Sequence, residues 1–353
     1  MIEDSGLDVI AIGPLYCRDK GERSMKKILV IATGGTIASK EKGNGLEPEA
    51  TGEELLAGVP DLPEGCRLDT LQLMNIDSTN MCKRQWEKIR DTILEKYQEY
   101  DGFVILHGTD TLAYTAAILS YLIQGSEKPI VLTGSQMPMD HSYTDAKINI
   151  YQSVIYALDE DSHEVSIVFN GKAIAGTRGK KQRTRSFHAF DSINFPPLAS
   201  IYGSKVERTY PAKPFSGKLR VSRQIDDRVF LLKLTPGIHP DIFRALTESY
   251  DAVILETFGI GGIPCGEDGA FEAALFDWVE GGKTLAVTTQ VMEEGCDLGV
   301  YQVGKRFSED ERILQAGNMT TEAVLAKLMW ILGETKDTSE IHRLFYRTVN
   351  HDR

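Results

Sequence analysis

A continuous apolar run that ends abruptly in a glycine pair is the feature that most constrains how this chain can fold. Residues 28–36 read ILVIATGGT, so five apolar residues lead into two threonines that flank two glycines. Such a run is typical of a strand that is buried on both faces, as in a parallel sheet. The turn places the Thr36 hydroxyl at the carboxyl end of the strand, where open parallel sheets bind ligands. We interpret Thr36 as a candidate nucleophile, and the alternative is a purely structural turn.

Strand and helix patterns alternate along the rest of the chain. In the first part, strands are predicted at 67–73, 103–106, 130–132 and 166–169, and helices at 82–97, 112–123 and about 143–158. In the second part, strands are predicted at 229–234, 252–255 and 285–288, and helices from 239, at 270–279, within 320–332 and within 339–349. This alternation indicates an α/β protein with mainly parallel sheets that helices cover on both faces.

The length of 353 residues favours two domains over one core. Residues 209–217 read TYPAKPFSG, a polar stretch with two prolines that is typical of a domain boundary. We therefore predict an N-terminal domain at 25–208, a linker at 209–222 and a C-terminal domain at 223–353. Residues 1–24 are interpreted as an extension that adds no chemistry, either disordered or upstream of the true start at Met25.

Charge and composition exclude several classes of function. The 39 Lys and Arg residues are outnumbered by 51 Asp and Glu residues, and a net charge of −12 disfavours binding to nucleic acid. An acidic N-terminus and the lack of an 18-residue apolar segment predict a cytoplasmic protein without a membrane partner. The five cysteines lack any Cys-x-x-Cys pair, and no His or carboxylate cluster has metal-ligand spacing. We expect no metal and no cofactor.

Hydroxyl-rich turns follow four of the first five predicted strands. Besides the Thr36 turn, they are the turns that contain Asp77, Ser78 and Thr79, then Thr109 to Thr111, then Thr133 to Ser135. Because carboxyl ends of parallel strands meet at one edge, these turns are expected to share one rim. Glycines in three of the turns would let a small ligand approach backbone N–H groups, as an oxyanion site requires.

The residue types available on this rim limit its chemistry. A threonine hydroxyl needs a base to act as a nucleophile, and a lysine from the basic run at 178–185 could serve. Alternatives remain for each of these residues. Thr109 and Asp110 could cap the following helix, because Thr and Asp are preferred at helix starts. His107 could be a packed residue, and the basic run could be a solvated loop.

Four motifs together resemble a known family. They are ATGGTIAS at 32–39, HGTDTLAYTA at 107–116, LTGSQMP at 132–138 and a lysine-bearing turn near 181. The chain from Met25 to its C-terminus is similar to L-asparaginases, most of all to the cytoplasmic type I group. The resemblance implies a larger N-terminal catalytic domain and a smaller, Rossmann-like C-terminal domain. It also implies a homodimer or homotetramer that hydrolyses L-asparagine to L-aspartate and ammonia without a cofactor.

The resemblance also implies roles for the catalytic group. Thr36 matches the threonine that attacks the amide carbon and forms an acyl-enzyme. Thr109 matches the hydroxyl that works with a lysine, and the count along the motif selects Lys181 rather than Lys180. Asp110 matches the carboxylate that binds the substrate's α-ammonium group, a charge-assisted hydrogen bond.

The remaining predicted residues bind the substrate. Ser78 and Thr79 match residues that bind the α-carboxylate, and Asp77 and Ser135 complete the predicted substrate-binding set. The backbone N–H groups of Thr36 and Thr109 and the region of Ser135 are expected to stabilise the oxyanion, at roughly 3 to 4 kcal/mol for each donor.

Two departures from the family pattern bear on the mechanism. The lid expected at 37–50 often supplies a tyrosine in the family, but no Phe, Tyr or Trp lies between Thr36 and Trp86. Gly262 stands where secreted relatives place an asparagine that reaches the neighbouring subunit. Three other functions stay open: a dual glutaminase and asparaginase, the amide-hydrolysing subunit of an archaeal-type tRNA amidotransferase, and a catalytically silent amino-acid sensor. The amidotransferase usually has an extra N-terminal domain, for which residues 1–24 are too few.

Overall fold

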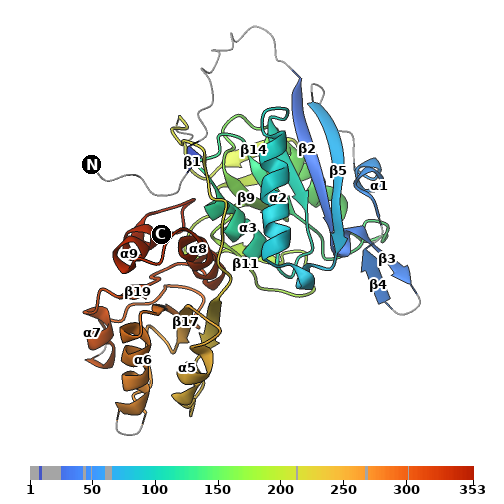
Figure 1. The fold of residues 1–353 in the computed structure, drawn as a ribbon. Coiled ribbons are helices and arrows are strands. Elements are labelled where there is room, and N and C mark those ends of the chain that lie inside the picture. Colours follow the sequence, from blue (N-terminus) through green and yellow to red (C-terminus); the bar gives the residue numbers. More distant parts are fainter. Residues whose placement is uncertain are drawn as a thin grey trace. The chain divides into compact units, whose positions relative to one another are not determined.

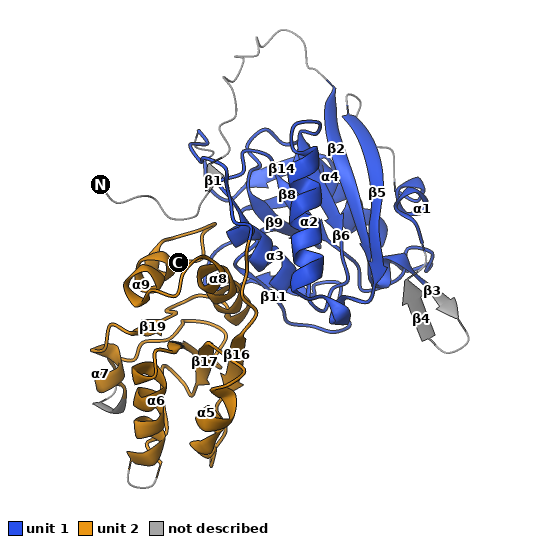
Figure 2. Ribbon diagram, in the orientation of Figure 1, with its two compact units in different colours: residues 1–223 blue, residues 224–353 orange. Residues whose placement is uncertain are grey.

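The computed structural model describes residues 8–9, 25–42, 45–48, 50–59, 66–211, 214–266, 269–300 and 302–353. Within these ranges, only the backbone is described at 8–9, 40–42, 45–48 and 302–303. The chain divides into two compact units, residues 1–223 and 224–353 (Figure 2). The division lies one residue beyond the end of the predicted linker. Each unit has its own sheet.

The first unit is built on an eight-stranded mixed sheet (Figure 1). Its strand order is β14-β13-β10-β9-β8-β6-β2-β5. The strands are β2 (Lys26–Gly34), β5 (Cys66–Ile76), β6 (Gly102–Leu106), β8 (Ile130–Thr133), β9 (Val165–Phe169), β10 (Lys172–Ala175), β13 (Ala199–Tyr202) and β14 (Lys205–Arg208). Neighbours from β9 to β5 pair in parallel, and β10, β13 and β14 continue the sheet in antiparallel pairs.

The antiparallel edge begins at a tight hairpin between β9 and β10. Asn170 and Gly171 form its turn with positive φ values of 48° and 77°, as a two-residue hairpin of this type requires. The predicted parallel sheet is confirmed for five strands, and β10 continues it in the antiparallel sense. The further strands β13 and β14 had not been predicted.

Helices cover both faces of the parallel strands. They are α1 (Gly52–Ala57), α2 (Lys83–Lys96), α3 (Leu112–Leu122) and α4 (Ala146–Leu158). Ile28 and Val30 of β2 pack in one apolar cluster with Ile150 and Val154 of α4. The alternate residues of β2 are buried too, and α2 and α3 lie over that side of the sheet (Figure 1). Burial on both faces explains why the strand sequences are continuously apolar.

Short paired segments complete the first unit. The 3₁₀ helix η1 (Thr36–Ala38) leads into a hairpin of β3 (Ser39–Lys42) and β4 (Gly45–Pro48). A second hairpin joins β11 (Gly179–Lys181) to β12 (Phe190–Ser192), and a small sheet joins β1 (Asp8–Val9), β15 (Arg220–Val221) and β7 (Ile123–Gln124). The lid predicted at 37–50 contains the β3–β4 hairpin, but the side chains of residues 40–49 lie outside the described part. Its role as a lid stays a prediction.

The second unit contains a four-stranded parallel sheet in the order β16-β17-β18-β19. The strands are β16 (Val229–Lys233), β17 (Ala252–Thr257), β18 (Thr284–Thr289) and β19 (Ile313–Gln315). The helices are α5 (Asp241–Leu246), α6 (Ala270–Glu280), α7 (Gln302–Ser308), α8 (Thr321–Glu334) and α9 (Thr338–Tyr346). Phe271 and Leu275 of α6 pack against Val253 and Leu255 of β17. The predicted α/β class is confirmed, with a larger first unit and a smaller, Rossmann-like second unit.

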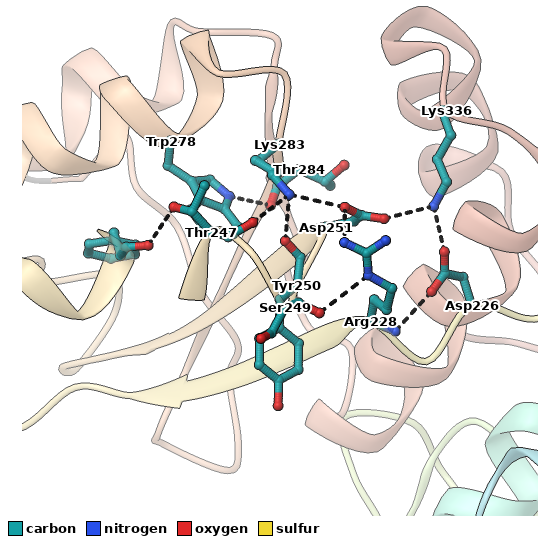
Figure 3. Close-up of polar contacts among 11 residues, drawn as sticks. Asp226, Arg228, Thr247, Ser249, Tyr250, Asp251, Trp278, Lys283, Thr284 and Lys336 are labelled. Atoms are coloured by element: carbon teal, nitrogen blue, oxygen red, sulfur yellow. Dashed lines mark hydrogen bonds and ion pairs between the residues drawn. The ribbon is translucent and has the colours of Figure 1, made fainter. Parts of the chain in front are cut away.

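A polar network holds the amino ends of the second sheet together (Figure 3). The Asp251 carboxylate, just before β17, accepts hydrogen bonds from Arg228 at 3.0 Å, Lys283 at 3.1 Å and Lys336 at 3.3 Å. Lys336 also donates to Asp226 at 2.6 Å. The cations come from the residue before β16, the residue before β18 and the connection between α8 and α9. Asp251 thus joins segments that are far apart in sequence.

The charge on Asp251 should therefore contribute to stability above acidic pH. Partial burial acts to raise the pKa of Asp251, but the hydrogen bonds from Lys283 and Lys336 outweigh it and the net pKa is lowered. A lowered carboxylate pKa stabilises the fold above the unfolded value of about 4, and this stabilisation is lost as the pH falls.

Replacing Asp251 by asparagine tests this contribution. Because the network is partly exposed, we expect Asp251→Asn to lower the free energy of unfolding by roughly 1 to 2 kcal/mol at pH 7. The difference should shrink towards pH 3, because the Asp251 carboxylate of the unfolded chain is then largely protonated. Urea denaturation at both pH values measures it. Glu207→Gln, which removes an exposed pair with Lys205, is the control expected to stay near wild type. An equal loss at pH 7 and pH 3 would contradict the electrostatic explanation.

Candidate active site

The four hydroxyl-rich turns of the first unit follow four adjacent strands. The strands β8, β6, β2 and β5 are neighbours in the sheet and run parallel. Their carboxyl ends therefore lie at one edge, and the turns that contain Ser135, Thr109, Thr36 and Ser78 meet there. The predicted convergence of these turns on one rim is confirmed. A small ligand at this edge could touch several of them at once.

Glycines bring the turns into backbone contact. A Cβ atom on Gly35, which has a φ of +81°, would lie 2.3 Å from the Cα of Gly108. A Cβ on Gly108 would lie 2.6 Å from the Oγ of Ser78, and one on Gly134 would lie 2.3 Å from the carbonyl oxygen of His107. Real Cβ atoms do not approach other atoms so closely, so only glycine fits at these positions. The residues that follow Gly35 and Gly108 are Thr36 and Thr109, so these two threonines belong to turns that are in contact.

Two threonines of the first turn have different surroundings. Thr33 is buried, and its hydroxyl donates a 2.9 Å hydrogen bond to the carbonyl of Leu106, which joins β2 to β6. Thr36 begins η1 and is half-buried. Within the part of the chain that the structure describes, its hydroxyl has no hydrogen-bond partner. The Thr33 hydroxyl thus has a structural role, whereas the nucleophilic role of Thr36 stays a prediction.

A lysine, a threonine and a carboxylate form one hydrogen-bonded group on the same rim. Lys181 Nζ donates to Thr109 Oγ1 at 2.8 Å and to Asp110 Oδ1 at 2.7 Å. The Lys181 side chain is 17% exposed and that of Asp110 is 60% exposed. Lys180 lies opposite Asp191 on the other face of the β11–β12 hairpin, because side chains alternate along a strand. The structure thus brings Lys181, and not Lys180, to Thr109.

Neither Thr109 nor Asp110 caps the following helix. The N-cap of α3 is Thr111. Thr109 is buried, and its hydroxyl donates to the side-chain oxygen of Gln136 at 3.3 Å while it accepts from Lys181. The Gln136 amide in turn donates to the carbonyl of Arg183 in the β11–β12 connection at 3.3 Å. Gln136 therefore links Thr109 to the hairpin that carries Lys181, a contact that sequence reasoning missed.

The turn after β5 is stabilised from within. Asp77 is the N-cap of the 3₁₀ helix η2 (Ser78–Asn80), and its carboxylate accepts from both the backbone N–H and the hydroxyl of Thr79, each at 2.8 Å. Ser78 is buried, and its backbone carbonyl accepts from the Thr111 hydroxyl at 2.7 Å. The structure therefore brings Ser78 to the rim and gives Asp77 a capping task. Binding of a substrate by these three residues stays a prediction.

The turn after β8 depends on a buried carboxylate. Asp145 accepts hydrogen bonds from the backbone N–H of Gln136 at 3.0 Å and of Met137 at 3.1 Å. Burial raises the pKa of Asp145. The Ser135 hydroxyl donates to the carbonyl of Met137 inside the turn. Ser135 thus helps to shape the turn, and its predicted contact with the substrate is untested.

His107 is a packed residue in a buried polar chain. It is fully buried, and burial lowers the pKa of His107 to about 4. It is neutral at pH 7, with Nδ1 donating to the carbonyl of Gly108 at 2.7 Å and Nε2 accepting from the hydroxyl of Thr115 at 3.0 Å. The indole N–H of Trp86 donates to Thr115 at 2.9 Å. This series of hydrogen bonds from Trp86 through Thr115 and His107 stabilises the turn at Gly108.

The described ranges contain neither a cluster of metal ligands nor a membrane-spanning helix. There, no group of three His, Cys, Asp or Glu side chains is arranged to hold a metal ion. None of the helices in the same ranges is long and apolar enough to cross a membrane.

Both halves of the chain match known protein families. Residues 27–213 match the family described as asparaginase, N-terminal, and residues 228–345 match the glutaminase/asparaginase C-terminal domain.

Individual proteins agree with these matches. The chain is 36% identical to an L-asparaginase of Thermococcus kodakarensis over 92% of this chain and 98% of that protein. It is 32% identical to L-asparaginase 1 of Escherichia coli over 90% and 95% of the two chains. It is also 35% identical to a glutamyl-tRNA(Gln) amidotransferase component of Metallosphaera sedula, over 90% of this chain but 74% of that protein.

Solved structures share the fold. The thermostable L-asparaginase from Thermococcus kodakarensis superposes with a TM-score of 0.86 at 34% identity, over 92% of this chain and 98% of that chain. L-asparaginase I from Vibrio cholerae superposes with a TM-score of 0.81 at 29% identity, over 93% and 99% of the two chains. The two-unit α/β architecture described above is thus that of these structures.

Proposed function

The chain belongs to the asparaginase family, and we propose that within it this protein is an L-asparagine amidohydrolase, which forms L-aspartate and ammonia. One observation carries the proposal. The hydrogen-bonded group of Lys181, Thr109 and Asp110 lies beside the turn that presents Thr36, because Gly35 packs on Gly108. This edge therefore offers a hydroxyl with no partner among the described residues, a second hydroxyl that is bonded to a cation, and a carboxylate that is open to solvent.

These groups would bind both polar ends of a free amino acid. The Asp110 carboxylate, exposed on one side, would take the α-ammonium group in a charge-assisted hydrogen bond. Ser78 and Thr79 would take the α-carboxylate from the neighbouring turn. The side-chain amide would then point towards Thr36, as a near-attack arrangement requires.

The reaction would proceed in two balanced steps. Thr36 Oγ1 attacks the amide carbon and a bond forms between Thr36 and the acyl group. The proton of Thr36 is passed to the amide nitrogen, so that ammonia leaves as the C–N bond breaks. The Thr109 and Lys181 pair is the proposed proton relay. Water then cleaves the ester and releases L-aspartate, with the proton returned to Thr36. The backbone N–H groups of Thr36 and Thr109 would stabilise the oxyanion in both steps.

Two alternatives use the same site differently. Similarity to a glutamyl-tRNA(Gln) amidotransferase component at 35% identity favours an enzyme that hydrolyses an amide within a larger reaction, as the second candidate. The net charge of −12 makes binding of a tRNA unfavourable. A catalytically silent sensor would have no use for the Lys181 and Thr109 pair.

A comparison of two amides tests the proposal. We expect kcat/KM for ammonia release to be roughly 10- to 200-fold higher with L-asparagine than with L-glutamine, the discrimination that one methylene allows. Enzyme-coupled detection of ammonia under steady-state conditions measures both. Similar values would make the protein a dual glutaminase and asparaginase. Tight binding of asparagine without ammonia release would instead indicate a sensor.

The resemblance and family membership support three further proposals. We propose that the protein assembles as a homodimer or homotetramer, acts in the cytoplasm, and uses no cofactor. Analytical ultracentrifugation of the purified chain tests the first, and activity after extensive dialysis against a chelator tests the last.

A further inference from the structure

Thr111 occupies a helix-capping position without capping the helix. It is the N-cap of α3, but its side chain makes no capping hydrogen bond there. A threonine at this position ordinarily accepts a hydrogen bond from a backbone N–H of the first turn. Its hydroxyl instead donates to the backbone carbonyl of Ser78 at 2.7 Å, 33 residues earlier in the chain. The Thr111 hydroxyl thus contacts the Ser78 turn instead of capping α3.

The contact joins the two turns that would hold the substrate. Ser78 belongs to η2, whose shape is maintained from inside by Asp77. Thr111 directly follows Asp110, so the hydrogen bond from its hydroxyl links the Asp110 turn to the Ser78 turn. Gly108, in the same turn as Asp110, packs closely on the Ser78 side chain. The separation between Asp110 and Ser78 is therefore fixed by the Thr111 hydroxyl as well as by packing.

We propose that Thr111 is a positioning residue that sets the affinity for substrates with both an α-ammonium and an α-carboxylate group. The inference rests on the proposed function, in which Asp110 binds the first group and Ser78 with Thr79 bind the second. The two groups share one carbon atom in the substrate, so their separation cannot adapt to the protein. A displaced Ser78 turn can satisfy only one of them, and binding weakens before the chemistry at Thr36 is affected.

Replacing Thr111 by valine removes the hydroxyl and keeps the shape of the side chain. We expect KM for L-asparagine to rise roughly 10- to 30-fold, the effect of one lost buried hydrogen bond, with kcat changed less than about threefold. The inhibition constant of L-aspartate, which carries both α groups, should rise by the same factor. Thr111→Ser keeps the hydroxyl and should restore both values.

The control and the outcomes separate this inference from the function on which it rests. Thr247→Val removes a comparable hydrogen bond, from the Thr247 hydroxyl to the carbonyl of Phe243 in the second unit, and should leave KM unchanged. Thermal unfolding of each variant verifies that it is folded. No ammonia release by the wild type would overturn the proposed function. Wild-type turnover with an unchanged KM in Thr111→Val, or with a loss confined to kcat, would overturn the inference alone.

Discussion

Thr36→Ala is expected to abolish ammonia release from L-asparagine while the protein stays folded. The half-buried Thr36 hydroxyl has no partner in the described part of the chain, so its removal leaves none of the described groups unsatisfied. Loss of a nucleophile removes the acyl-enzyme route, and kcat should fall by roughly 10⁴-fold or more. Ammonia assays measure the loss, and mass spectrometry of acid-quenched enzyme should detect an acyl adduct in the wild type and none in the variant.

Thr33 provides the matched control for this experiment. It lies in the same turn, but its hydroxyl donates to the carbonyl of Leu106. Thr33→Val should therefore lower the free energy of unfolding by roughly 1 to 2 kcal/mol, the effect of losing a buried hydrogen bond, and retain turnover. Appreciable turnover by Thr36→Ala would remove Thr36 from the nucleophile role. An inactive but folded Thr33→Val would transfer that role to Thr33.

Lys181→Met is expected to lower kcat by roughly 10²- to 10⁴-fold, the range associated with general acid and base groups. Methionine keeps much of the volume of lysine, but it removes the ammonium group that donates to Thr109 and Asp110. The Thr109 hydroxyl would then lose its link to a proton carrier. Steady-state kinetics at a fixed pH measure the change, and circular dichroism shows whether the fold is kept.

The neighbouring lysine is the control for Lys181. Lys180 lies on the opposite face of the hairpin, across from Asp191, so Lys180→Met should change kcat by less than about threefold, as expected for a group outside the relay. A damaging Lys180→Met together with an active Lys181→Met would show that the lysine had been assigned one residue too late. Equal damage by both would point to a general requirement for positive charge near Thr109.

Much of the fold could be predicted because a strand that is buried on both faces has a continuously apolar sequence. Strands such as β6 are covered on both faces, so all five of their residues are buried and a continuous apolar run identifies them. The convergence of the polar turns followed from one rule, that parallel strands end on the same side. The choice of Lys181 over Lys180 came from matching residues to the family motif, and the geometry agrees with it because Lys181 donates to Thr109.

Contacts between distant side chains could not be predicted. Gln136 bridges Thr109 and the β11–β12 connection, and Asp145 holds the Gln136 turn. Each contact joins turns or elements whose separation no local pattern encodes. Gln136 stood inside a recognised motif, which is the one signal that could have selected it. The antiparallel strands β13 and β14 were not predicted because their residues are partly exposed and the strands are not continuously apolar.

The backbone contact between Gly35 and Gly108 limits how this site can change during evolution or laboratory selection. A side chain at either position would force the two turns apart and would separate Thr36 from Thr109. Variants with new substrate preferences are therefore expected to keep both glycines. Libraries that aim to change the preference would gain most by holding these two positions constant. The same contact gives a simple criterion for relatives of unknown activity, because a chain that lacks either glycine should have lost this chemistry.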